Sequence, residues 1–150
     1  MFSDIASHGG GTLVAEGSHK VVAKFLAGYP DGISLRDGIE TLNQRHPWLS
    51  ELTGITPATT NESRIDRFMN QFWTDDDGFK LRVVEVTGEP GDVILCHPFL
   101  YHASSQNHSG QVRFLCNRTT PLVEHMNFDR EEDSQYSPLE QSIRDALGKV

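Results

Sequence analysis

Apolar side chains recur at the spacing of an amphipathic helix in four segments of the chain. Ser18 precedes the first segment in a position to cap a helix that Gly28 ends. Ser137–Glu140 opens the last segment with a capping serine, a proline at the first helical position and a glutamate that completes a capping box. The pattern predicts helices over Ser18–Ala27, part of Ser34–Arg45, Asn61–Phe72 and Pro138–Leu147.

Short runs of strand-forming residues, separated by turn residues, dominate the chain from residue 81 onward. No repeat or interdomain linker divides the 150 residues, so we expect a single domain over residues 1–150. Short strands with helices inserted early favour a mainly β fold, a barrel or jelly roll with helical decoration. The predicted strands are Thr12–Glu16, Leu81–Val86, Asp92–His97 with a further stretch to His102, Val112–Asn117 and Leu122–Phe128.

Composition excludes several classes of function. A net charge of −8 argues against nonspecific nucleic-acid binding, which depends on neutralising phosphates with Lys and Arg. No apolar run approaches the roughly 18 residues of a membrane span, and the N-terminus lacks the pattern of a signal peptide. Cys96 and Cys116 lie in apolar runs, so we expect buried, reduced thiols in a cytoplasmic protein, with a disulfide between neighbouring strands as the alternative.

Three adjacent carboxylates at Asp75–Asp77 precede Gly78 in the segment between the helical and strand regions. Carboxylates attract calcium, but this run lacks the alternating ligand spacing and distal glutamate of a calcium loop. We therefore predict a solvated turn. The whole insert from Gly28 to Leu81 is the expected source of lid and substrate contacts, because binding residues concentrate on connecting segments.

His102 and Arg113 are the residues that point most directly to chemistry. They lie eleven residues apart around a turn at Gln106–Gly110, and residues nearly opposite each other in a hairpin face the same side. A neutral imidazole beside a guanidinium suits a divalent metal next to a small molecule that bears a carboxylate. Such a site needs two more metal ligands. Arg118 is the fallback anchor, although its parity places it on the other face of the predicted strand.

Two ordered segments, Gly9–His19 and Gly91–Arg113, resemble the phytanoyl-CoA dioxygenase family. The first keeps Gly-Ser-His but has Glu16 where that family usually has proline. The second has a Gly-Asp strand start, then a histidine followed about ten residues later by an arginine. The closing Ser-Pro-Leu-Glu helix also looks like the C-termini of that family. The resemblance implies a double-stranded β-helix of the jelly-roll, cupin-like kind and an oxidoreductase that uses Fe(II) and 2-oxoglutarate.

By the same resemblance, His102 corresponds to the late iron ligand and Arg113 to the anchor of the distal 2-oxoglutarate carboxylate. Both side chains are then expected to project into the barrel and to bracket one small dicarboxylate. His97 before Pro98 is expected to be structural, and His19 to support its turn. The implied activity is hydroxylation of a small organic substrate, whose identity the sequence does not reveal.

The family holds iron through an early His-x-Asp as well as the late histidine, and this chain departs from that pattern. None of its seven histidines begins a His-x-Asp or His-x-Glu. We therefore expect the C-terminal part of a longer dioxygenase domain, incomplete at the N-terminal side of its barrel and inactive alone. The alternatives are a noncatalytic jelly roll that keeps the Arg113 carboxylate pocket, and a fragment with no independent function.

Overall fold

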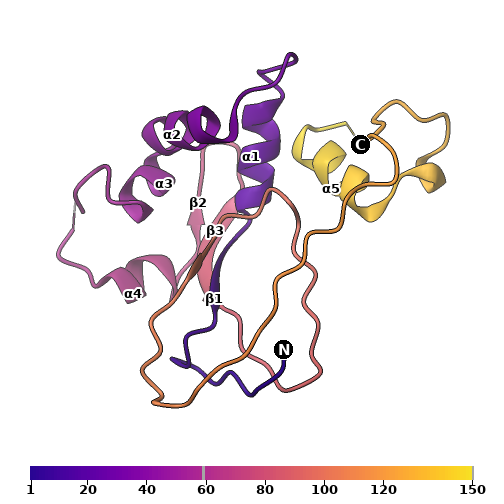
Figure 1. Ribbon diagram of the computed structural model, residues 1–150. Coiled ribbons are helices and arrows are strands. Elements are labelled where there is room, and N and C mark those ends of the chain that lie inside the picture. The colour runs from indigo at the N-terminus through magenta and orange to yellow at the C-terminus, as the bar shows by residue number, and fades with distance from the viewer. Residues whose placement is uncertain (59, 150) are drawn as a thin grey trace.

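A computed structural model describes residues 1–58 and 60–149, and its centre is a four-stranded antiparallel sheet in the order β2-β3-β1-β4 (Figure 1). The antiparallel sheet with helices agrees with the predicted fold class only in part. More of the described residues lie in helices than in strands, so the expectation of a mainly β fold is wrong for this structure, and a jelly roll stays a prediction. The elements are β1 (Thr12–Glu16), α1 (Ser18–Leu26), α2 (Leu35–Arg45), α3 (Pro47–Leu52), α4 (Arg64–Phe68), β2 (Trp73–Thr74), β3 (Lys80–Glu85), β4 (His102–Ser104), η1 (Asp133–Gln135) and α5 (Pro138–Ala146).

One face of this sheet is covered by the first four helices. Ala15 of β1 pairs with Val83 of β3, and both side chains are buried. Residues that pair directly in an antiparallel ladder lie on the same face, so this face points into the core. The buried core joins it to α1, α2, α3 and α4 through Val21, Leu42, Trp48, Leu49 and Phe68.

The opposite face of the sheet carries the alternate residues. Val14 pairs with Val84 on one side and with His102 on the other. Glu16 pairs with Arg82, and their side chains form an ion pair at 2.9 Å. These side chains are half-buried or exposed, whereas Leu81 on the core face is completely buried. This second face is called the open face below.

The start of α1 differs from the predicted serine cap. Gly17 is the N-cap residue, with φ +85°, and a Cβ there would lie 2.1 Å from the Lys80 carbonyl oxygen. Glycine is therefore required by both the backbone angle and the close approach of β3. Ser18 is instead the first helical residue, and its buried hydroxyl accepts a hydrogen bond from the Tyr101 amide at 2.9 Å. The serine joins α1 to the segment before β4.

Two of the predicted helices follow their local signals closely. The Ser34 side chain caps α2 by accepting from the Asp37 amide at 3.1 Å. Ser137 and Glu140 form the predicted capping box of α5, with Pro138 in the first turn. The helix expected over Asn61–Phe72 is shortened to α4, because Ser63 caps it later and the chain then enters β2.

Three predicted strands, Asp92–His97, Val112–Asn117 and Leu122–Phe128, are wrong for this structure, because none of the described residues there belongs to a strand. A strand requires a hydrogen-bonded neighbour, and these runs pair with no strand of the described chain. Their apolar side chains are correspondingly exposed, including Val93, Leu95, Val112, Phe114 and Val123.

The two cysteines also lie in this region, and their predicted burial is wrong. Cys96 and Cys116 are both exposed free thiols. The disulfide considered as the alternative is not formed. Among the residues described, no helix is both long enough and apolar enough to cross a membrane.

Candidate functional site

His102 is the first residue of β4 and lies on the open face of the sheet, directly opposite Val14. Its Nδ1 is 3.0 Å from the Leu100 carbonyl oxygen. A carbonyl only accepts hydrogen bonds, so this contact requires a hydrogen on Nδ1 and leaves the Nε2 lone pair free in the neutral ring. Metal-binding histidines use this arrangement, in which a backbone carbonyl orients the ring and the other nitrogen binds.

Arg113 is half-buried and lies against Gly10, just before β1. A Cβ added at Gly10 would lie 3.0 Å from the Arg113 Nε and 2.9 Å from the Asn107 Cβ. Gly10 also has φ +79°, so its missing side chain and its backbone angle together leave room for the guanidinium stem. His102 thus lies beside Val14 of β1, and Arg113 lies beside Gly10, which precedes Val14 by four residues.

The turn between the two candidates is built by Asn107. Its side chain donates to the Gln111 carbonyl at 2.6 Å and accepts from the Ser109 amide at 3.0 Å. Gly9 and Asn107 also form an isolated antiparallel bridge. After this turn the chain returns toward Gly10, where Arg113 lies, but it does not form the strand predicted over Val112–Asn117. The predicted turn is therefore present, and the predicted hairpin of two paired strands is not. The proposed bracketing of a dicarboxylate by His102 and Arg113 stays a prediction.

The described residues do not complete an iron centre. No three His, Cys, Asp or Glu side chains within residues 1–58 and 60–149 lie close enough together to hold a metal ion. His102 has a suitable tautomer, but these residues supply no further pair of ligands beside it. The residues present therefore do not fit an iron-binding facial triad.

His19 and His97 form a contact that the sequence did not reveal. Their rings are in tilted contact, with 4.9 Å between centroids and 37° between planes, and the His97 Nδ1 accepts from the Phe99 amide at 3.1 Å. Burial lowers the pKa of both imidazoles, helped at His19 by the nearby charge of Lys20. These neutral rings join α1 to the loop that leads to β4, which agrees with a structural role for His97.

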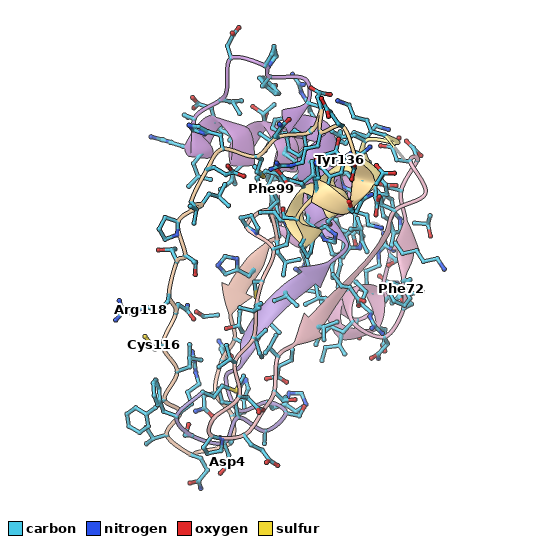
Figure 2. The ribbon with its side chains drawn as sticks, turned by 90° about the vertical axis from the view of Figure 1, so that its right-hand side faces the viewer. Asp4, Phe72, Phe99, Cys116, Arg118 and Tyr136 are labelled. Carbon is cyan, nitrogen blue, oxygen red and sulfur yellow. The ribbon has the colours of Figure 1, made fainter. Side chains whose placement is uncertain are left out.

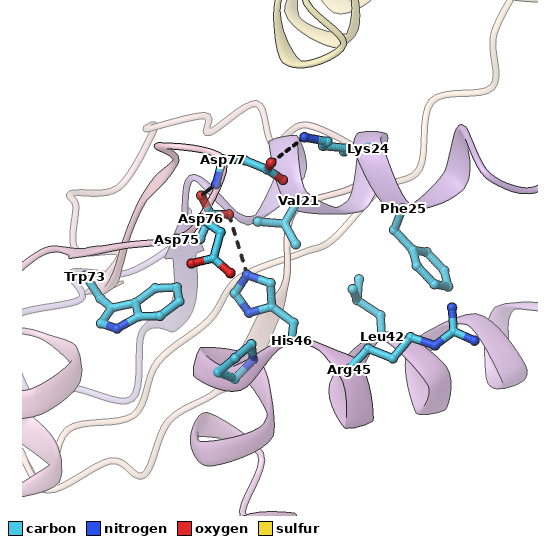
Figure 3. A pocket seen from close by; sticks show the side chains of 11 residues that line it. Val21, Lys24, Phe25, Leu42, Arg45, His46, Trp73, Asp75, Asp76 and Asp77 are labelled. Carbon is cyan, nitrogen blue, oxygen red and sulfur yellow. Dashed lines mark hydrogen bonds and ion pairs between the residues drawn. The ribbon is translucent and has the colours of Figure 1, made fainter.

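The insert between Gly28 and Leu81 contributes to a second site, a pocket of about 280 Å³ beside α2 (Figure 3). His46 accepts from the Leu49 amide at 3.3 Å and directs its other nitrogen toward Asp75, 3.6 Å away. Asp75 also accepts from the amides of Asp77 and Phe79 at 3.0 and 2.7 Å. The predicted solvated turn is therefore wrong for Asp75, whose carboxylate is almost fully covered.

His46 explains why a helix follows immediately where one was expected to end. Its backbone ends α2, and its ring caps α3, which has Pro47 in its first turn. His46 and Asp75 consequently join the α2–α3 corner to the turn between β2 and β3. The hydrogen bonds of His46 and Asp75 thus connect parts of the fold to one another. Lys24 and Asp77 form an ion pair at the edge of the same pocket.

Comparison with known proteins identifies one family. Residues 57–115 match the family model described as phytanoyl-CoA dioxygenase (PhyH). The matched segment contains β2, β3, β4 and both candidate residues, His102 and Arg113. No curated protein and no solved structure matches the chain.

Proposed function

We propose that this chain carries the late half of an Fe(II)- and 2-oxoglutarate-dependent oxygenase site, because its residues 57–115 match the phytanoyl-CoA dioxygenase family model. His102 is the proposed iron ligand, and Arg113 the proposed anchor of the distal carboxylate of 2-oxoglutarate. The observation that carries the proposal is the His102 ring, held by the Leu100 carbonyl with Nε2 free, inside the matched segment.

The role of Arg113 is supported by its packing. A guanidinium forms two parallel hydrogen bonds with a carboxylate, which gives both strength and orientation. A Cβ at Gly10 would lie 3.0 Å from the Arg113 Nε and 3.3 Å from its Cδ, so the glycine leaves the space that the stem of Arg113 occupies. No ion pair involving Arg113 occurs among the described residues, so its guanidinium is available for an external carboxylate.

We further propose that this chain alone is inactive. A single histidine competes poorly with water for iron, since tight binding requires several ligands on one face of the metal. His102 is exposed on the open face, where a further segment bearing a His-x-Asp would have room to complete the site. The substrate of the completed enzyme is proposed to be a small organic molecule of unspecified type.

The test compares 2-oxoglutarate conversion to succinate by the 150-residue chain and by an extended chain with an upstream His-x-Asp. Fe(II) and ascorbate are supplied to both. The proposal expects succinate only from the extended chain. There, His102→Ala should abolish turnover, Arg113→Ala should chiefly raise the KM for 2-oxoglutarate, and His108→Ala in the exposed turn should change neither.

Robust iron-dependent turnover by the short chain, abolished by His102→Ala, would contradict the proposed inactivity. An active extended chain that tolerates both His102→Ala and Arg113→Ala would contradict the residue assignment.

A second function, a metal-free carboxylate-binding module, is favoured by the placement of Arg113 alone. It predicts saturable binding of 2-oxoglutarate to the short chain without iron. Arg113→Lys keeps the charge but removes the two-pronged geometry, and should weaken that binding. Titration calorimetry on the chain and this variant decides between the module and the half-site, which predicts no saturable binding without metal.

A further inference from the structure

A mostly apolar pocket of about 540 Å³ lies between α1 and α5. Neither His102 nor Arg113 lines it. Its volume falls in the range of small-molecule sites, which are mostly apolar with a few placed polar groups. The lining residues are Ala23, Leu26, Ala27, Phe99, Met126, Phe128, Ile143, Leu147 and Lys149.

The pocket adjoins the place where α1 and α5 contact each other. Ala23, Ile143 and Ala146 form a small buried cluster between these helices. Ala23 of α1 and its C-cap residue Ala27 line the pocket, and their methyl groups leave space that a larger side chain would fill. Phe99 closes another side and lies next to α5 (Figure 2).

The wall formed by Met126 and Phe128 is held in place by α5. The Asn127 amide, between these two residues, donates to the buried Glu140 carboxylate at 2.7 Å. The Tyr136 hydroxyl donates to the Phe128 carbonyl at 3.1 Å. These bonds position the wall before any ligand arrives, which lowers the entropic cost of binding.

Among residues 1–58 and 60–149, Lys149 is the only charged residue that lines the pocket, and the end of α5 determines the position of its backbone. Gly148 has φ +67°, and its amide donates to the Asp145 carbonyl at 3.2 Å. The Lys149 amide donates to the Arg144 carbonyl at 3.0 Å. This pair of bonds is the Schellman motif, which turns the chain back across the helix end. Within the described residues, Lys149 forms no ion pair.

We propose that this pocket binds an aliphatic monocarboxylate, with its hydrocarbon chain against the apolar walls and its carboxylate at the Lys149 ammonium. Burial of the hydrocarbon supplies most of the affinity. The Lys149 ammonium at the edge of the pocket favours a negatively charged head group over a positively charged one. A chain of about ten carbons is the probe chosen for the test, because it is soluble as the free anion.

The experiment is titration calorimetry of the 150-residue chain with decanoate, butyrate and decyltrimethylammonium. Decanoate should bind with one-to-one saturation. Butyrate should bind at least tenfold more weakly because it buries fewer methylenes, and decyltrimethylammonium about two- to fivefold more weakly because Lys149 repels its head group.

Two variants test the pocket from the protein side. Lys149→Gln should weaken decanoate binding about two- to fivefold, as expected for an exposed charge pair, and added salt should reduce this difference. Lys80→Gln is the matched control, an exposed lysine outside the pocket, and should leave binding unchanged. Ala27→Phe places a large side chain at the exposed edge of the pocket and should reduce decanoate binding at least tenfold.

Absence of saturable decanoate binding overturns the proposal, as does equal affinity for decyltrimethylammonium. If Lys149→Gln and Lys80→Gln reduce the affinity for decanoate equally, the proposed role of Lys149 is overturned. Circular dichroism establishes whether Ala27→Phe is folded. If that variant is unfolded, the comparison of the three ligands on the unmodified chain still decides the outcome.

Discussion

The two faces of the central sheet differ in what covers them. On the core face, Ala15, Leu81 and Val83 are buried beneath the first four helices. On the open face, Val14 is half-buried and its neighbour His102 is exposed. The same short strands therefore supply a stable core on one side and the proposed half-site on the other. The core face is thus closed by packed side chains, whereas the open face leaves His102 accessible.

The contrast continues along the sequence. The chain up to β3 places its large apolar side chains mainly in the core, whereas the segment from residue 92 to 123 exposes several of them. Leu95 is 92% exposed and Leu49 is 0% exposed. Large exposed apolar surfaces in a soluble domain mark interaction sites or unpaired elements. The exposed runs coincide with the three strands that the sequence predicts and the structure lacks.

The largest expected effect comes from comparing one leucine of each region. Leu49→Ala should reduce the free energy of unfolding by about 2–5 kcal/mol, because it leaves a cavity in the core. Leu95→Ala makes the same chemical change at an exposed position and should cost less than about 0.5 kcal/mol. Urea unfolding measures both. Equal costs would mean that the segment around Leu95 is packed in solution, which would remove the contrast between the regions.

A smaller effect is expected at the point where α1 meets the sheet. Gly17→Ala adds a Cβ 2.1 Å from the Lys80 carbonyl at φ +85°, so the backbone must shift, at a cost of about 1–3 kcal/mol. Gly78→Ala has nearly the same angle, φ +82°, with no atom within 4 Å, and should cost about 1 kcal/mol. Comparing the thermal melting of the two variants separates the cost of the clash with the Lys80 carbonyl from the cost of the positive φ angle. Equal shifts in Tm would show that β3 does not approach Gly17 closely.

The third prediction concerns residues 127–137, which the Glu140 carboxylate of α5 contacts through Asn127, Arg130 and Ser137. The Arg130 guanidinium hydrogen-bonded to Glu140, together with the amides of Asn127 and Ser137, lowers the pKa of this carboxyl to about 2. Because the pKa is lowered in the folded state, its contribution to stability is present above about pH 4.5 and is lost as pH falls toward 2.

Glu140→Gln should therefore flatten the pH dependence of stability between pH 4.5 and 2, as measured by urea unfolding at several pH values. Glu131→Gln, at an exposed neighbouring carboxylate, should leave that dependence unchanged. A variant curve parallel to that of the unmodified chain would show that Glu140 does not hold the segment.

The sequence predicted best where the signal was local. Ser34 and the Ser137–Glu140 box act within one helical turn, and both helices begin where expected. Ser18 carried the same local signal, but its hydroxyl bonds to Tyr101, which lies 83 residues away. Pro47 directly follows the helix expected within Ser34–Arg45, and it also suits the first turn of the next helix, α3.

The missing strands show a different limit. Alternation of apolar and polar residues indicates how a strand would be oriented, but it does not establish that a partner strand exists. His102 and Arg113 were identified from motif and spacing, and their residue roles stay predictions. The pocket between α1 and α5 could not be foreseen, because its lining comes from segments that the fold alone brings together.

The most direct test of the half-site is a metal titration of the 150-residue chain, with Co(II) as a spectroscopic substitute for Fe(II) and 2-oxoglutarate present. We expect no saturable one-to-one binding, because no three metal-ligating side chains gather around a common point among the described residues. Stoichiometric Co(II) binding that is lost in His102→Ala and kept in His108→Ala would contradict it, and would show that the chain completes its own metal site.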